Sequence, residues 1–263
     1  MKIVHRVSLS TTDTIRQELA ALGIHIGDGF ATFVVDEAHP RWAQIEAFIA
    51  RYRALDMVST KATAKELAAA DWVVMEPTWH GGYPQPEDEY MECTYDLSDY
   101  CRVCGVGGVQ CAPFRMRGEP KWGNRSILQL HWVYDEFFAR RDVWESVLLP
   151  LGITSRPVIH HKSGATLHTI VQCDFGTIAD SSLELGEHPY DHCPLCGRRK
   201  FLPFTRGCFP RFQSPPAGPP VVKSREYFGS GASAFREIAV SHEMYMAIAK
   251  AGLRGCSFLP MCQ

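Results

Sequence analysis

Two short cysteine motifs carry the clearest chemistry in the sequence. They are Cys101-Arg-Val-Cys104-Gly105 and Cys193-Pro-Leu-Cys196-Gly197. Two residues between a pair of thiolates allow both sulfurs to reach one Zn²⁺ at about 2.3 Å. A glycine after the pair accommodates a positive φ, so that backbone N–H groups can turn toward the sulfurs. Four thiolates leave no open coordination position, so the motifs predict one structural zinc ion per chain, bound by Cys101, Cys104, Cys193 and Cys196.

Three other interpretations of the motifs remain open at this stage. Each CxxC could be a thioredoxin-like redox site, although Gly105, Gly107 and Gly108 argue against a helix after the first pair. A ligand could be replaced by a nearby residue of suitable chemistry, namely His188, His192, Cys111 or Cys208. The four thiols could also be inert. The long spacer exceeds that of the usual zinc ribbon, so a whole strand–helix segment must be inserted between the two halves.

The remaining cysteines are not expected to bind the metal. They are Cys93, Cys111, Cys173, Cys208, Cys256 and Cys262. Three of them, Cys173, Cys256 and Cys262, lie in or near apolar, strand-like stretches, where a cysteine is usually a core thiol.

Other potentially reactive residues do not assemble into a catalytic motif. His160 and His161 would face opposite sides of a strand. His242-Glu243 begins a near match to HExxH, but Met246 stands where the second histidine should be. The sequence contains neither a phosphate-binding loop nor a Gly-x-Ser-x-Gly elbow. We therefore predict a protein that is not an enzyme.

Composition predicts an ordinary globular protein. Of 263 residues, 46% are hydrophobic and 21% charged, and the formal net charge is −2. This balance supports a large core and gives no global attraction to nucleic acid or anionic lipid. No signal peptide or membrane-spanning stretch is evident. We expect a cytoplasmic protein without a membrane partner, in which paired cysteines indicate metal rather than disulfides.

The order of predicted elements indicates an α+β fold in two domains. Residues 1–85 form a small N-terminal α/β unit, with helices capped by Thr12 or Asp13 and by Thr63 and strands at 30–35 and 72–75. Residues 86–263 form a zinc-stabilised α+β domain. Strands are expected at 127–133, 158–159, 237–240 and 256–259, and helices follow Asp142 and Ser241. Residues 76–100 and the proline-rich stretch 203–224 are predicted loops or connectors.

The C-terminal domain also shows a possible internal duplication. A strand, a helix, a glycine and a second strand follow one another over 136–158, and the same order recurs over 237–261. Unrelated strand–helix–strand units often look alike, so this similarity is weak.

An acidic, tyrosine-bearing run lies at the start of the second domain. Its residues include Glu87, Asp88, Glu89, Tyr90, Glu92, Tyr95, Asp96, Asp99 and Tyr100, with no basic residue among them. Such a run is often only a solvated surface. Tyrosine also supplies contact area at low entropic cost, and carboxylates steer encounters. We therefore consider the segment from Glu87 to Asp96 a candidate surface for a basic protein partner.

The cysteine motifs and their surroundings resemble the double-CXXCG paralogous family of myxobacteria. The similarity includes Tyr100-Cys101, Cys193-Pro-Leu-Cys196-Gly197-Arg198, Tyr227-Phe228-Gly229 and the final Gly-Leu-Arg-Gly…Phe-Leu-Pro. It covers roughly residues 90–263. Some members are described as SitI-class immunity proteins, which protect a cell from a toxin exchanged between kin. The resemblance implies that this chain binds and neutralises a cognate toxin.

A zinc-ribbon protein that binds nucleic acid is the alternative. It requires a basic, aromatic face, and the local basic cluster comprises Arg198, Arg199, Lys200, Arg206 and Arg211. The same charges, with Arg102, are placed to offset a tetrathiolate metal site of net charge near −2.

Overall fold

The computed structural model describes residues 1–261 and shows a mixed α+β protein built from two compact units. One unit comprises Met1–Glu66 with Phe204–Cys208, and the other comprises Leu67–Pro203 with the chain from Phe209 onward. The division therefore falls near residue 66, whereas the sequence suggested residue 85. No helix among the described residues is long and apolar enough to cross a membrane.

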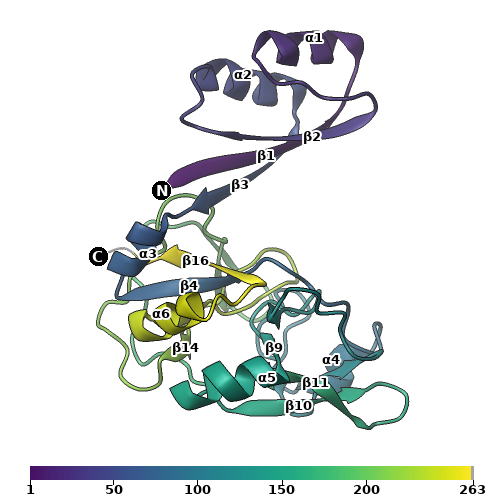
Figure 1. Cartoon of the computed structure of the whole chain (residues 1–263), viewed down its shortest axis with the longest axis vertical. Coiled ribbons are helices and arrows are strands. Elements are labelled where there is room, and N and C mark those ends of the chain that lie inside the picture. Colours follow the sequence, from purple (N-terminus) through teal and green to yellow (C-terminus); the bar gives the residue numbers. More distant parts are fainter. Residues whose placement is uncertain (262–263) are drawn as a thin grey trace. The chain divides into compact units, whose positions relative to one another are not determined.

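The N-terminal unit is a three-stranded antiparallel sheet with two helices on one side (Figure 1). Its elements in chain order are β1 (Lys2–Ser10), α1 (Asp13–Ala21), β2 (Phe30–Asp36), α2 (Trp42–Tyr52) and β3 (Leu55–Lys61). Thr12 caps α1 through its side chain, as predicted. Apolar residues at helical spacing, such as Ile15 and Leu19, pack against alternate residues of β1 and β2. The strand order is β2-β1-β3.

The difference in the domain boundary comes from β4 (Trp72–Pro77). This strand pairs antiparallel with β15 (Ile238–Ser241) on one side and with β16 (Cys256–Pro260) on the other. With β14 (Val221–Lys223) they form a four-stranded sheet of order β14-β15-β4-β16. The segment before β4 contains α3 (Ala64–Ala69), which opens with reciprocal hydrogen bonds between Thr63 and Glu66.

A second sheet in the larger unit has the order β7-β10-β11-β9-β8. Its strands are β7 (Arg115–Met116), β8 (Ile127–Leu128), β9 (Phe138–Arg140), β10 (Ser155–His160) and β11 (Thr166–Cys173). Between β9 and β10 run α5 (Arg141–Val143), a π-helical turn η1 (Trp144–Leu148) and a 3₁₀ turn η2 (Leu149–Leu151). Side chains of both sheets, of η1 and of α6 (His242–Lys250) share one hydrophobic core.

The two stretches that suggested a duplication have the same local topology. β9 and β10 are parallel and lie on either side of the antiparallel β11, with helical turns between them in sequence. β15 and β16 are likewise parallel, lie on either side of the antiparallel β4 and are connected by α6. The central strand β11 follows β9 and β10 in sequence, whereas the central strand β4 precedes β15 and β16. This correspondence is what a duplication requires, and the duplication itself stays a prediction.

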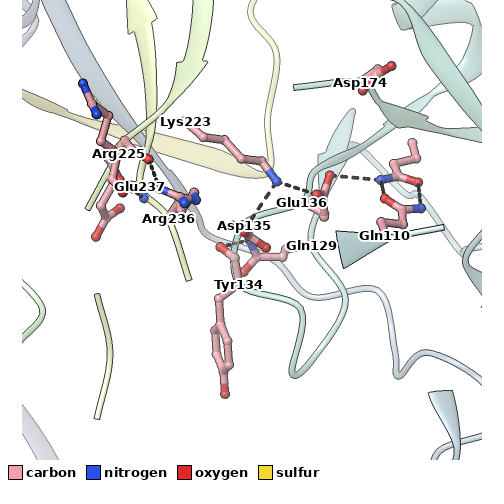
Figure 2. Close-up of polar contacts among 12 residues, drawn as sticks. Gln110, Gln129, Tyr134, Asp135, Glu136, Asp174, Lys223, Arg225, Arg236 and Glu237 are labelled. Carbon is pink, nitrogen blue, oxygen red and sulfur yellow. Dashed lines mark hydrogen bonds and ion pairs between the residues drawn. The ribbon is translucent and has the colours of Figure 1, made fainter. Parts of the chain in front are cut away.

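A buried polar chain connects the two sheets (Figure 2). Lys223 of β14 forms ion pairs with Glu136 and with Asp135, the latter at 3.5 Å. Glu136 accepts a hydrogen bond of 2.9 Å from the side chain of Gln172 on β11. Gln172 in turn exchanges two side-chain hydrogen bonds with Gln110. Each buried charge or amide therefore has a partner, as a low-dielectric interior requires.

Glu237 lies immediately before β15 and close to this network (Figure 2). Burial raises its pKa to about 8, and the negative charges of Glu76 and Asp135 act in the same direction. Burial also raises the pKa of Glu76. The folded protein therefore holds a proton on Glu237 at pH values where an unfolded chain has released it.

This difference predicts a pH-dependent contribution to stability. The free energy of unfolding should fall as pH rises from the ordinary carboxyl range toward 8, because the folded state binds the proton more tightly. Glu237→Gln should remove about 2 kcal/mol of that fall between pH 6 and pH 8.5, at about 1.4 kcal/mol per pKa unit. Urea unfolding at the two pH values measures the effect. Glu187→Gln, at an exposed position, is the control, and an equal pH slope in wild type and Glu237→Gln would contradict the assignment.

Candidate metal centre

Each cysteine motif forms the end of a short antiparallel hairpin. The first lies between β5 (Tyr95–Asp96) and β6 (Val109–Gln110), and the second lies between β12 (Tyr190–His192) and β13 (Arg199–Phe201). The Cys101 N–H donates to the Val106 carbonyl at 2.8 Å, and the Cys193 N–H donates to the Arg198 carbonyl at 3.0 Å. These are equivalent positions, so the two motifs fold into the same local turn.

The two turns bring four sulfurs to one point. Cys101 Sγ lies 3.7 Å from Cys193 Sγ, and Cys104 Sγ lies 3.6 Å from Cys196 Sγ. All four sulfurs lie within 4.8 Å of one another. A tetrahedron with metal–sulfur bonds of about 2.3 Å has sulfur–sulfur edges of about 3.8 Å. The cluster therefore fits a single four-coordinate ion, and the predicted ligand set is brought together as a group that could hold a metal.

Backbone N–H groups of the turns point at the first sulfur of each motif. The N–H groups of Cys104 and Val103 lower the pKa of Cys101 to about 6, and those of Cys196 and Leu195 lower the pKa of Cys193. Burial instead raises the pKa of Cys104 to about 12. Hydrogen bonds thus favour thiolate at two sulfurs, whereas holding four thiolates together requires a cation between them.

Two basic residues of the second turn bind the first one. Arg198 donates to the carbonyls of Asp99, at 2.7 Å, and Val106, at 3.2 Å, and also pairs with the Asp99 carboxylate. Lys200 is 2% exposed, and its Nζ donates to three carbonyls. Those carbonyls belong to Cys104, Gly231 and Ser233, at 2.9, 2.6 and 2.8 Å. The charges expected to offset the thiolates therefore also clamp the two hairpins and the segment 231–233 together.

The two motif glycines have similar backbones but different surroundings. Gly105 has φ +80°, and a Cβ there would lie 2.2 Å from the Ala232 carbonyl oxygen. Gly197 has φ +70°, and nothing lies within 4 Å of its Cβ position. Gly105 is thus required for close backbone approach as well as for conformation, whereas Gly197 is required for conformation alone.

The geometry bears on the alternatives left open by the sequence. Among the described residues, the group of side chains that could hold a metal consists of Cys101, Cys104, Cys193 and Cys196, called the tetrad below. It includes no histidine and no other cysteine. His188 Nε2 instead lies 2.7 Å from the Leu202 carbonyl oxygen. Cys111 is exposed, and Cys208 is disulfide-bonded. Turns rather than helices follow both motifs, which removes the main feature of a thioredoxin-like site.

The other cysteines lie apart from the tetrad. Cys173 is 1% exposed within the hydrophobic core, and Cys256 packs against the same core. Burial raises the pKa of Cys256 to about 12, which is typical of an inert thiol. Cys93 is half-buried, and Cys262 lies outside the described residues.

The predicted acidic surface is folded rather than extended. A short helix, α4 (Tyr90–Thr94), interrupts the expected loop. Within the predicted surface from Glu87 to Asp96, four carboxylate residues are exposed, namely Asp88, Glu89, Glu92 and Asp96. Glu87 is held by an ion pair with Arg117 and by a hydrogen bond from Gln85. Tyr90 stacks on Trp132, whereas Tyr95 packs edge-on against Phe114 and contributes to the core.

Sequence reasoning missed several residues beside this surface. Trp132 and Tyr134 are each 45% exposed, and Trp132 lies in the segment 127–133 that was expected to be a strand. The strand β8 ends at Leu128, and the chain then turns. The partial alternation of 127–133 does not reveal that turn. The pair of large aromatic residues Trp132 and Tyr134 is visible in the sequence, but their exposure is not.

No family model matches the chain, and searches of curated proteins and of solved structures likewise find no match.

Removing one ligand should unfold more than the turn that contains it. Structural zinc contributes about 10–16 kcal/mol of binding free energy in small zinc domains. Cys193→Ser should therefore abolish stoichiometric metal and destabilise the larger unit by several kcal/mol, measured by elemental analysis and thermal unfolding. Cys256→Ser is the control and should cost some stability while leaving the metal content unchanged. Loss of metal in the control, or full metal in Cys193→Ser, would show that the ligand set is wrong.

The two glycines provide a separate test of how the two cysteine hairpins and the segment 231–233 are held together, an arrangement called the clasp below. Gly105→Ala should destabilise the protein by roughly 3 kcal/mol or more, since it adds a backbone clash to an unfavourable φ. Gly197→Ala should cost only about 1–2 kcal/mol for its φ. Denaturant midpoints of the two variants measure the two losses of stability. Equal destabilisation would mean that the backbone of residues 231–234 does not approach Gly105 closely.

Proposed function

We propose that this chain is a cytoplasmic immunity protein that binds a cognate toxin and neutralises it by covering its active surface. The resemblance of the paired CXXCG motifs suggests the role and the class of partner. The observation that carries the proposal is the acidic, aromatic surface around α4, next to the clasped hairpins. Occlusion requires tight binding rather than chemistry, so this function needs no catalytic residue.

We further propose that the ion at the tetrad is zinc and that its role is structural. Four thiolates in a tetrahedral arrangement are the donor set of structural zinc sites. Because the four ligands fill the coordination sphere, zinc bound there would stabilise the fold without an open position for substrate. The proposed zinc-stabilised domain then corresponds to the larger unit.

The surface around α4 has the chemistry that suits a basic protein. Asp88, Glu89, Glu92 and Asp96 are exposed, and Tyr90 and Trp132 stack beside them with ring centroids 6.1 Å apart. Carboxylates of this kind accelerate association with a positively charged partner. Aromatic side chains supply the buried anchors that dominate binding energy. A toxin that attacks nucleic acid has a basic active surface, which makes it a fitting partner.

The metal clasp would also favour tight binding by fixing this surface in advance. β5 begins directly after α4 and leads into the first metal turn, and β6 returns from it. Gln110 of β6 joins the buried polar chain through Gln172. A surface held in its binding conformation loses less entropy on association.

The nucleic-acid alternative finds little support in the basic cluster that suggested it. Arg198 and Lys200 donate to backbone carbonyls of the clasp, and Arg199 lies over the ring of Tyr190 at 4.4 Å. The other two members are paired with carboxylates, Arg206 with Glu37 and Arg211 with Glu184. These charges are engaged within the protein rather than gathered on an open face.

Charge reversal tests the proposed surface. Asp88, Glu89 and Glu92 changed together to lysine should slow association with the toxin by at least tenfold at low salt, because steering acts mainly on the association rate. The control reverses Glu145, Glu187 and Glu243, which are exposed elsewhere in the same unit and give the same change in net charge. Surface plasmon resonance measures the rates, with metal content and melting temperature confirming that both variants fold.

The function itself is tested in a sensitive host that expresses the toxin encoded beside this chain. Co-expression of the chain should restore growth. Failure to protect, with both proteins soluble, would contradict the immunity proposal. Protection with equal association rates for the surface and control variants would retain the function and reject the location of the interface.

A further inference from the structure

A hollow of about 340 Å³ opens beside the first metal turn. Its wall is formed by six aromatic residues, Tyr90, Tyr95, Tyr100, Trp132, Tyr134 and Tyr227. The rest of the lining includes Met91, Val133 and Asp135, together with small residues such as Gly105, Gly107 and the segment 232–234 that Lys200 clamps to the turn. The volume lies at the lower end of the roughly 300–1,000 Å³ typical of ligand sites.

Trp132 is held at this hollow in an unfavourable backbone conformation. Its φ is +68°, a value that bulky side chains rarely adopt. The strain orients a ring that is 45% exposed, with its centroid 4.5 Å from that of Tyr83 and 6.1 Å from that of Tyr90. Strained backbone and exposed aromatic surface both cost stability, and such costs concentrate at functional sites.

Carboxylates lie in and beside the wall of the hollow. Asp135 contributes to the wall, and its partner Lys223 is shared with Glu136, so one lysine faces two carboxylates (Figure 2). Glu92 acts electrostatically on both Tyr90 and Tyr100, and Arg102 acts on Tyr100 in the opposite direction. The described residues that line the hollow include no lysine or arginine. A cation entering it therefore meets electron-rich ring faces and the carboxylate of Asp135.

The protein already uses one ring of this wall in that way. The guanidinium of Arg236 lies 4.0 Å from the centre of the Tyr227 ring. Cations are attracted to the faces of tyrosine and tryptophan rings, and several rings around one cation form an aromatic cage. A nucleobase would also stack on such rings, but its phosphate would be repelled by the carboxylates.

We propose that this hollow is an aromatic cage that receives a lysine or arginine side chain of the basic partner. The inference rests on the proposed function, since it specifies how the toxin is held. The cage supplies the buried anchor, and the exposed carboxylates around α4 supply the long-range attraction. Asp135 gives the bound cation its nearest counter-charge, and Trp132 closes one side.

The cage can be tested without the toxin. N-acetyl-arginine methylamide is titrated into the full-length, metal-loaded protein, and binding is followed by NMR through the indole N–H signal of Trp132, assigned with Trp132→Phe. The citrulline analogue has nearly the same shape without the charge. We expect the arginine probe to shift this signal and to bind at least tenfold more tightly than citrulline. Equal binding, or shifts that map elsewhere, would overturn the proposal.

Variants separate the cage from general stability. Trp132→Gly removes the ring and relieves the unfavourable φ, so it should fold normally and weaken the arginine probe at least fivefold, whereas Trp132→Phe should retain most of the binding. Tyr190→Ala, at a 49% exposed tyrosine outside the hollow, should bind as wild type. Because these variants can lack the Trp132 signal, the rings of Tyr90 and Tyr134 serve as reporters. Unchanged affinity in Trp132→Gly would reject the cage.

The same variants distinguish the two proposals in the host assay. If arginine binds the cage but the chain does not protect against the toxin, the cage stands and the immunity function fails. If the chain protects and Trp132→Gly protects and binds toxin equally well, the function stands and the cage as its anchor fails.

Discussion

The larger unit depends on two turns, 92 residues apart in sequence, meeting at one point. Neither hairpin has enough paired strand to stabilise itself, since β5 and β6 are two residues long and β12 and β13 are three. Three of the four cysteines at the meeting point are only 6% exposed. Contacts among buried thiols contribute little to stability, whereas metal–thiolate bonds contribute their binding free energy to folding. We therefore propose that closure of the chain between the turns depends on metal binding.

Protein contacts reinforce the same closure. Lys200 is buried on three backbone carbonyls from two separate segments, which gives its charge the hydrogen bonds that burial demands. Gly105 permits the segment at Ala232 to approach the first turn. The polar chain from Lys223 to Gln110 joins the opposite side of this hairpin to the sheets. Gly105 and the segment 232–234 also line the hollow with the aromatic wall. The contacts that hold the hairpins together and the candidate binding surface therefore share residues.

Local chemistry allowed some features to be predicted from sequence. The tetrad follows from motif spacing, and the caps at Thr12, Thr63 and Ser241 follow from side chains that accept nearby N–H groups. Non-local pairing was beyond such reasoning. Nothing in the pattern of β4 indicates that its neighbours are β15 and β16, which lie near the other end of the chain. That pairing moved the unit boundary to near residue 66. The positive φ of Trp132 and the burial of Lys200 likewise arise from tertiary contacts rather than local preference.

We propose that one pair of cysteines from each turn holds a single zinc ion. X-ray absorption at the zinc edge, on protein purified without chelator and containing one zinc per chain, reports the atoms bound to that ion. We expect four sulfur neighbours at about 2.3 Å and no bound nitrogen or oxygen. Fewer than four sulfurs, with a histidine or water completing the shell, or protein that folds fully without metal, would contradict it.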